Sequence, residues 1–238
     1  MKKAAIIQSS YIPWRGYFDV IHDVDVFVFL DTVQLTKQDW RVRNRIKTRA
    51  GTKWRTVPIV GGLKQRICDA KIAQNDWQRG SRWRAQHRHA LECEYARAPH
   101  FSEYAWLLDW LYGRKHEYLS ELNQGAIRLI CKHLGIRTRL ICATQLEPQG
   151  DKNERLVDIL RKVGANMYLS GPSAQSYLDE EKFRKAGIEV RYKDYSDYPV
   201  YEQLHPPFDP FVTVLDLLFT CGPESPYYIW GHRRRKDK

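Results

Sequence analysis

AAIIQSSYIPWRGYFD, residues 4–19, is the stretch of sequence that decides the fold. Its apolar run, residues 4–7, is too short for a helix and is typical of a buried strand. Pro13 turns the chain before an apolar helical pattern begins, and Gly16 is expected to let backbone or a ligand approach closely. A second apolar run at residues 26–30 predicts a neighbouring strand. The order strand, polar loop, helix, strand indicates an α/β sheet.

Polar side chains follow both of these predicted strands. The first strand leads directly into Gln8, Ser9, Ser10 and Tyr11, and the second leads into Asp31 and Gln34. Ligands of open α/β sheets bind at the carboxyl ends of strands. We therefore expect a ligand site here, to which Trp14 and Tyr17 also contribute. The alternative is that this loop only caps the following helix.

The rest of the chain continues the alternation, with one interruption. Further strands are predicted at residues 138–143, 167–169 and 188–192, and helices at 152–163, 178–186 and 212–219. Residues 76–135 are nearly all helical in pattern. We therefore predict an α/β protein with a mostly parallel, Rossmann-like sheet, a basic β-hairpin and an inserted helical subdomain. Its parts are an α/β core (1–75 and 136–228), the helical insertion (76–135) and a basic tail expected to be disordered (229–238).

The basic hairpin is predicted at residues 40–59, where polar and apolar residues alternate around an Ala-Gly-Thr turn. Every second position on its first strand is a cation: Arg41, Arg43, Arg45, Lys47 and Arg49. Side chains two apart on a strand share a face, so these cations repel one another unless an anion neutralises them. The hairpin therefore predicts a phosphate site. Asn44 lies at the other parity and is expected to point elsewhere, or to mark a bulge.

The charge of the chain is concentrated in the same region. The formal net charge is +11, and residues 37–88 hold fifteen Lys or Arg against three Asp or Glu. Such a field suits an anionic partner, first a phosphate-bearing small molecule and second a nucleic acid. The tryptophans of this segment interleave with cations, as in single-strand binders. Core positions are the more usual explanation for tryptophans, and a solvated basic face is the alternative for the cations.

Composition narrows the class of protein further. The five cysteines form no CxxC pair, which predicts reduced thiols, a cytoplasmic location and no zinc site. The histidines are dispersed, so no metal centre is expected. The first residues lack the apolar core of a secretory signal, and no apolar run is long enough to cross a bilayer.

A second strand-end loop, LSGPSA at residues 169–174, is a further candidate for binding. Ser170, Gly171 and Ser173 would let backbone N–H groups approach a phosphate. The loop lacks the spacing of a Walker loop, so a turn chosen for geometry alone is the alternative. Among acidic groups, Asp216 lies in an apolar helix. It is a candidate for catalysis, although pairing with an arginine or capping a loop is the preferred interpretation.

Several motifs together resemble one family. They are QSSYIPWRGYFD, DTVQ, DWRVRNRIKT with KWRTVPI, YLSGPSAQSYLDEEKF, YPVYEQLHPPF and VLDLLF. In this combination the chain resembles the WbqC-like family from about residue 6 to about residue 226. The opening motif of that family often has a histidine before the glutamine, where this chain has Ile7, so no role for such a histidine is carried over. The family is associated with O-antigen and other surface-polysaccharide gene clusters, which implies a cytoplasmic protein of sugar tailoring.

The layout is also similar to that of HIGH-type nucleotidylyltransferases and adenylate-forming ligases. Their phosphate-binding histidines are missing here, so the hairpin arginines would take that role. We expect a transferase that binds a nucleotide-linked amino sugar and adds an acyl or aminoacyl group from acyl-CoA, an acyl carrier or an ATP-activated donor. Gln8, Tyr11 and Asp31 would orient the reacting group. The alternatives are a tRNA-like nucleic-acid binder using residues 37–88 and a non-catalytic scaffold of polysaccharide assembly.

Overall fold

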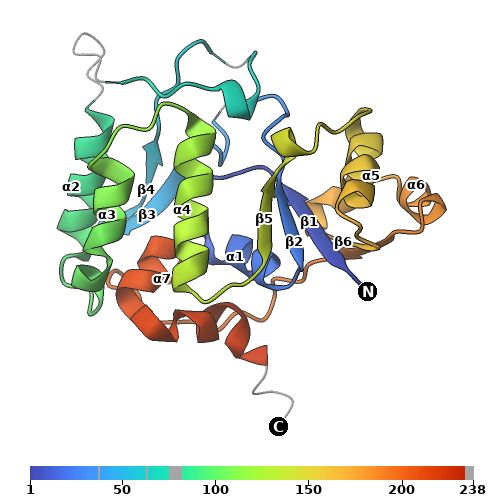
Figure 1. Ribbon diagram of the computed structural model, residues 1–238. Helices are drawn as coiled ribbons and strands as arrows, with labels where there is room; N and C mark the ends of the chain where they lie inside the picture. The colour runs from blue at the N-terminus through green and yellow to red at the C-terminus, as the bar shows by residue number, and fades with distance from the viewer. Residues whose placement is uncertain (37, 63, 75–81, 234–238) are drawn as a thin grey trace.

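A five-stranded parallel sheet forms the centre of the protein (Figure 1). The computed structural model describes residues 1–238 except 37, 63, 75–81 and 234–238. The strands of the sheet are β1 (Lys3–Ile7), β2 (Val26–Phe29), β5 (Arg139–Cys142), β6 (Met167–Ser170) and β7 (Glu189–Tyr192). Their spatial order is β5-β2-β1-β6-β7, and every neighbouring pair is parallel. The predicted mostly parallel α/β sheet is therefore confirmed.

Helices cover both faces of this sheet. The first face carries α1 (Arg15–His22), α4 (Leu119–His133) and α7 (Val214–Cys221), and the second carries α5 (Lys152–Lys162) and α6 (Glu180–Lys185). Successive strand residues alternate between the faces: Phe27 and Phe29 join the first core, whereas Val26 and Val28 join the second. This period of two explains why a continuous apolar run is needed for a strand buried on both sides.

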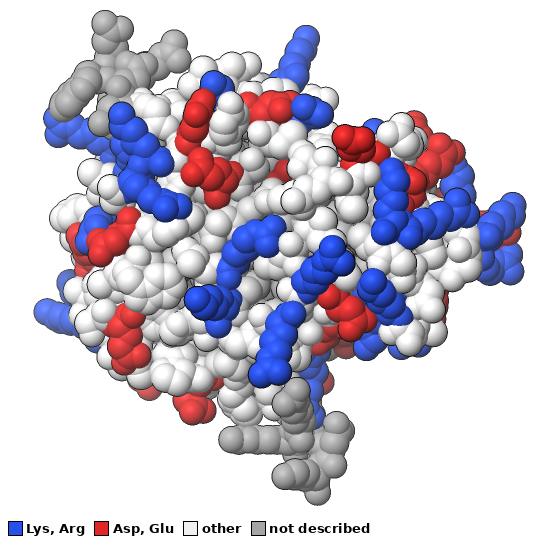
Figure 2. Space-filling model, in the orientation of Figure 1, with Lys and Arg blue, Asp and Glu red and all other residues white. Residues whose placement is uncertain are grey.

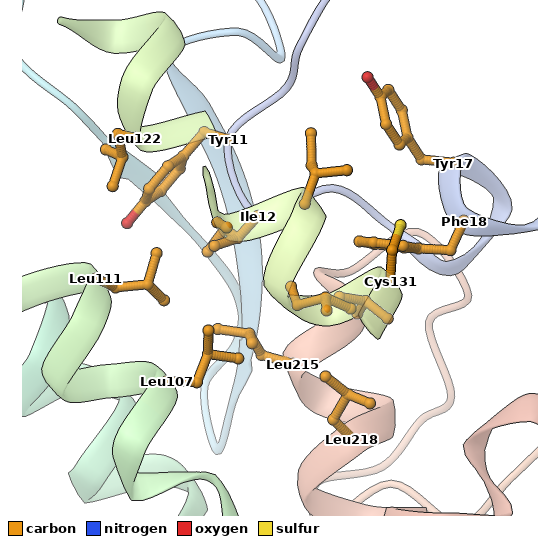
Figure 3. Close-up of a cluster of buried hydrophobic side chains, with 14 of the residues drawn as sticks. Tyr11, Ile12, Tyr17, Phe18, Leu107, Leu111, Leu122, Cys131, Leu215 and Leu218 are labelled. Atoms are coloured by element: carbon orange, nitrogen blue, oxygen red, sulfur yellow. The ribbon is translucent and has the colours of Figure 1, made fainter. Parts of the chain in front are cut away.

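The predicted hairpin and helices lie beside the first face. They are β3 (Arg43–Thr48), β4 (Gly51–Thr56), α2 (Trp83–Tyr95) and α3 (Ala105–Tyr112). Gly51 makes the hairpin turn with a φ of +89°. The start of the first helix, expected near Asp76, lies outside the described residues. Figure 3 shows Leu107 and Leu111 of α3 pointing toward Leu215 of α7, and Leu122 of α4 lying beside Tyr11; all of these residues belong to one core that includes the first face of the sheet.

The C-terminal segment corrects one expectation. The sequence predicts a disordered tail over residues 229–238, of which the structure describes 229–233, and Tyr227–Gly231 forms a π-helical turn in which Ile229 is fully buried. Trp230 stacks on His22 of α1, with ring centroids 4.1 Å apart. Burial of these two apolar side chains holds the segment against the core, whereas the prediction of disorder rests on the basic charge of the tail. Within the described parts of the chain, no helix has both the length and the apolar character needed to span a membrane.

The connections between strands reverse direction at β1. The chain leaves β1 through α1 and reaches β2 on one side, but it later leaves β5 through α5 and reaches β6 on the other side. The connections that leave the carboxyl ends of β1 and β6 therefore lead to helices on opposite faces of the sheet, α1 and α6. In doubly wound sheets, this switch point is where ligands bind.

Candidate functional site

A cavity of about 610 Å³ lies at the switch point. Ile6, Leu30 and Tyr168 supply its apolar surface from the three central strands, and Gln8 contributes an amide from the first loop. Tyr177, 66% exposed, stands at its edge. The volume lies in the range of small-molecule sites, which are typically apolar with a few polar groups that fix the ligand's orientation.

The N-terminus of α5 forms the cationic wall of this cavity, through Lys152 and Arg155. The Arg155 guanidinium donates twice to the Gly150 carbonyl, at 3.1 and 3.0 Å, which fixes its position. Asn153 lies beside them and accepts a 3.4 Å bond from the backbone of Asp179. A helix N-terminus carries a partial positive charge, so two cations on its first turns favour a phosphate.

Gln8 links this cavity to the first strand of the basic segment. Its side-chain oxygen accepts a 2.6 Å hydrogen bond from Arg41, whose guanidinium also contacts Asp39 at 3.1 Å. The Tyr17 hydroxyl donates to the backbone carbonyl of Gln8 at 2.9 Å. Three predicted site residues, Gln8, Tyr17 and Arg41, are thus brought together by the turn after β1.

Asp31 lies beneath this turn and is almost fully buried. Its carboxylate accepts from the backbone of Ser9 at 2.8 Å and from the side chain of Gln124 at 2.7 Å. Burial raises the pKa of Asp31, whereas the two hydrogen bonds and the nearby Arg41 oppose that rise. The Ser9 hydroxyl is buried and has no hydrogen-bond partner among the described residues.

The hairpin cations beyond Arg41 are already engaged by the protein itself. The Arg43 guanidinium lies 4.1 Å from the centre of the Trp54 ring. Arg45 approaches Asp209 at 3.5 Å and donates to the Phe211 carbonyl at 3.0 Å. Lys47 is buried, and its ammonium donates to the carbonyl of Pro207. A C-terminal loop thus supplies the hydrogen-bond acceptors for Arg45 and Lys47. The sequence predicts that the phosphates of a ligand fill this role.

Asn44 points to the core side of the hairpin, as its parity predicted. Its amide donates to the carbonyls of Tyr11 and Ile12 at 3.1 and 2.8 Å. Ile12 has a φ of +34°, which is uncommon for a branched residue, so these bonds hold a strained turn. The role of Asn44 in the structure is to shape the first loop.

Tyr11 is turned away from the other loop residues. It is fully buried, and its hydroxyl lies 2.9 Å from His87 Nδ1 and 2.7 Å from the Tyr112 hydroxyl. Figure 3 shows its ring between Leu122 and Leu111, with its hydroxyl pointing away from that of Tyr17. Tyr11 therefore anchors the loop to the helices α2 and α3.

Asp216 lies fully buried at the first turn of α7, and hydroxyl and amide donors surround it. It accepts from Tyr201 at 2.7 Å, from Tyr95 at 2.9 Å and from Gln203 at 2.9 Å. No described arginine pairs with it, so the expected arginine partner is replaced by neutral donors. Burial raises the pKa of Asp216, and these hydrogen bonds oppose the rise.

Two further residues of the first stretch, Trp14 and Gly16, have a packing role. The Trp14 ring contacts Tyr195, Tyr198 and Phe211 with centroids 5.1–6.1 Å apart. A Cβ on Gly16 would lie 2.3 Å from that ring. Gly16 therefore lets the Trp14 ring, and not a ligand, pack closely against the backbone.

The remaining predicted residues are spread along the strand ends. Ser170 is buried and donates to the Tyr168 hydroxyl at 3.3 Å, so it supports one wall of the cavity. Gly171 has open space around its α-carbon, and Ser173 is exposed. Ser10 is buried, whereas Gln34 is exposed and bridges to Arg66.

Sequence reasoning missed Lys152, Arg155, Tyr177 and Gln124. A signal for the first two was present, because residues 143–152 form a third loop that follows a strand and precedes a helix. Gln124 lies in an amphipathic helix that the sequence assigned to the core, and its site-facing position comes only from tertiary packing.

One group of described residues has the geometry to hold a metal: Asp19, His22 and Asp23. Lys193 lies 2.8 Å from Asp19 and 2.5 Å from Asp23, and Arg233 contacts both carboxylates. These cations neutralise the cluster. Burial raises the pKa of Asp23, but the hydrogen bond with His22, together with Lys193 and Arg233, outweighs burial and lowers that pKa well below its usual range. The group is therefore best described as an ion-pair cluster that holds the C-terminal segment on α1.

Comparisons with known proteins place the chain in a family. The model of the WbqC-like protein family matches residues 8–228. The chain is similar to uncharacterized protein Rv1507c of Mycobacterium tuberculosis, with 46% identity over 232 residues, which cover 96% of this chain and 98% of the relative. No solved structure matches the chain significantly.

Proposed function

Because the chain belongs to the WbqC-like protein family, we propose that it is a transferase of surface-polysaccharide biosynthesis of the O-antigen type. It acts in the cytoplasm on a nucleotide-linked amino sugar and transfers an acyl or aminoacyl group to the amine. The donor is an acyl-CoA, an acyl carrier or an ATP-activated acid. The observation that carries this proposal is the switch-point cavity, where apolar, amide and cationic side chains converge beside the turn that covers Asp31.

Each part of the cavity suits one part of such a substrate. Lys152 and Arg155, at the N-terminus of α5, bind the phosphates. Tyr177 offers an exposed ring on which the base stacks. Gln8, held by Arg41, then orients the sugar toward Asp31, which lies directly beneath the loop.

Asp31 is suited to the proton transfer that this reaction needs. The amine must lose a proton when it attacks the acyl carbonyl, and the leaving group must gain one. Burial raises the pKa of Asp31 toward the range in which a carboxylate accepts a proton readily. Its bonds to Ser9 and Gln124 fix its direction. Arg43, Arg45, Asn44 and Lys47 shape the hairpin, so the phosphate role proposed for them passes mainly to α5.

Calorimetric titration tests this assignment. A panel of UDP- and dTDP-amino sugars, ATP and CoA is titrated into the wild type and into a Lys152→Ala/Arg155→Ala double variant. We expect at least about tenfold weaker binding of the nucleotide sugar by the variant. Arg161→Ala, in the last turn of the same helix, is the matched control and should bind like the wild type. Equal affinity of the double variant and the control would contradict the phosphate site.

Nucleic-acid binding is the second candidate function, and one surface favours it. Arg128 and Lys132 of α4 and Arg137 and Arg139 at β5 are all exposed, and none has a carboxylate partner within the described ranges. Arg128, Lys132 and Arg137 border a hollow of about 490 Å³, and Figure 2 shows Lys and Arg side chains gathered over α4 and β5. Phosphate contacts release counterions, so binding by this face would weaken steeply with salt.

The second candidate has its own test. Bulk tRNA is titrated at about 50 and 200 mM salt into the wild type and into a variant with these four cations changed to Gln. Binding that is tight at low salt, lost at high salt and reduced in the variant would favour the nucleic-acid function. Absence of tRNA binding at low salt would eliminate it.

A further inference from the structure

Two tryptophans on the basic hairpin have no structural task that explains their exposure. Trp40 is 43% exposed and Trp54 is 41% exposed, whereas Trp83 of the same segment is buried against His87 and Tyr112. The Trp40 and Trp54 rings lie together, with centroids 5.2 Å apart. Adjacent large apolar groups left in water mark an interaction site more often than isolated ones do.

The surroundings hold these rings in place. Trp54 lies on β4 opposite Arg45, and the Arg43 guanidinium lies 4.1 Å from the centre of its ring. The backbone carbonyl of Trp40 accepts a 2.9 Å bond from the backbone of Tyr11. The cation stabilises the indole by its attraction to the π face and leaves the rest of the ring open. The pair is thus a preformed surface that loses little conformational freedom on binding.

The angle between the rings identifies the kind of group that they suit. The two indole planes are inclined by 46°. A flat nucleobase can lie against only one of two planes inclined in this way. A puckered sugar ring, in contrast, presents C–H groups on more than one side and can contact both. Its hydroxyls would find a donor in Arg43 and an acceptor in Asp39, which contacts the Trp40 backbone.

The pair is also connected to the switch-point cavity. Trp40 immediately precedes Arg41, whose guanidinium holds the Gln8 side chain at 2.6 Å, and Gln8 lines that cavity. A ligand with phosphates at α5 would extend past Gln8 toward the hairpin. We propose that Trp40 and Trp54 form the sugar-binding subsite of this protein, on which the pyranose ring of the nucleotide sugar packs; this inference rests on the proposed function.

Binding measurements with matched ligand pairs test the subsite. Each nucleotide sugar of a UDP and dTDP panel is compared with its free nucleotide by calorimetry. We expect the wild type to bind at least one nucleotide sugar about tenfold more tightly than the corresponding nucleotide. Trp54→Ala and Trp40→Ala should bring that ratio close to one and leave nucleotide affinity within about twofold of wild type. Trp54→Phe, which keeps a ring, should retain part of the ratio.

Trp106→Ala is the matched control, because Trp106 is 40% exposed but lies on α3 beside His133. This variant should behave like the wild type, and thermal melts verify that every variant is folded. If the Trp54→Ala and Trp40→Ala variants keep the full ratio, or if nucleotides bind but no nucleotide sugar binds more tightly than its nucleotide, the subsite is wrong and the α5 nucleotide site stands.

A nucleotide-free arm separates the two proposals. Oligosaccharides of N-acetylglucosamine are added while tryptophan fluorescence is recorded for the wild type and for Trp54→Ala. If the sugars quench the fluorescence of the wild type but not of Trp54→Ala, the subsite is supported even if no nucleotide binds. Absence of nucleotide binding in that case would overturn the α5 assignment alone. Quenching by oligo-dT but by none of the sugars would overturn the subsite in favour of nucleic-acid stacking.

Discussion

One buried carboxylate, that of Asp216, is satisfied by neutral partners, unlike Asp19, which pairs with Lys193 and Arg233. Two tyrosine hydroxyls and one glutamine amide donate to Asp216. Sequence reasoning identified it as costly to bury and predicted that it pairs with an arginine or caps a loop. The donors come from residues 95, 201 and 203, and nothing in the local pattern marks them as its partners.

Replacing Asp216 by Ala should therefore destabilise the protein strongly. Two buried hydroxyls and one amide would lose their acceptor, which we expect to cost about 3–5 kcal/mol in the free energy of unfolding. Urea denaturation measures this loss. Asp216→Asn keeps one acceptor oxygen and should lose less than Ala. A loss below about 1 kcal/mol for Ala would mean that the network contributes little to folding.

His87 predicts how stability depends on pH. Burial, with a smaller effect of Arg55, lowers its pKa from 6.5 to about 3. The unfolded chain therefore takes up a proton at this histidine below about pH 6.5, whereas the folded chain does not. Stability from this group is complete above pH 6.5 and is lost as pH falls toward 3, by about 1.4 kcal/mol per pH unit.

Denaturation of His87→Gln at several pH values checks this prediction. Between pH 6 and 4, the free energy of unfolding of the variant should fall less steeply than that of the wild type. The two slopes should differ by about 1.4 kcal/mol per pH unit, the contribution of His87. His89→Gln lies on the same helix but at an exposed position, and it should follow the wild-type slope. Parallel curves for the His87 variant and the wild type would show that His87 is protonated in the folded state.

The elements themselves were largely predictable. The periodicity of the sequence identified all five strands of the sheet, the hairpin and the amphipathic α4, because burial on one or both sides dictates those patterns. The use of the hairpin cations was not predictable. Lys47 is covered by a loop whose residue Pro207 lies 160 positions further along the chain. No local pattern records such a contact.

The start of α1 gives a prediction at this scale. Gly16→Ala would place a Cβ 2.3 Å from the Trp14 ring, so the ring and its aromatic neighbours must move. We expect a loss of about 1–3 kcal/mol from this overpacking, measured by thermal or urea unfolding. Gly171→Ala is the matched control, because no atom lies within 4 Å of its added Cβ and its φ of −73° suits alanine. Equal stability of the two variants would contradict the packing role of Gly16.

At the scale of the whole molecule, the site was predicted in part. The sequence located Gln8 and Asp31 because parallel strands place their carboxyl ends together. It did not locate Lys152 and Arg155 of α5. The order of the strands in space decides which loops lie next to the end of β1, and the sequence does not reveal that order. Charge was a weaker guide: it drew attention to the hairpin, whose cations bind the protein's own carbonyls, and away from Arg128 and its neighbours.

The C-terminal segment closes the molecule, and its contribution can be measured. Ile229 is fully buried, and Arg233 pairs with Asp19 and Asp23 of α1. A chain that ends at Tyr228 should be at least about 3 kcal/mol less stable than a chain that ends at Arg233, because it loses two buried apolar side chains. Urea denaturation of both gives the difference. Stabilities within about 1 kcal/mol of each other would show that the segment is dispensable.

The first loop also has a consequence for how the protein is made. Its shape depends on Trp40, which receives the Tyr11 amide, on Asn44, which holds Ile12, and on Val214, whose backbone donates to Pro13. A ribosome synthesises the last of these supports some two hundred residues after the loop. The first loop of a nascent chain is therefore unfinished until α7 has emerged, so the candidate site at the switch point can form only after Val214 has been added to the chain.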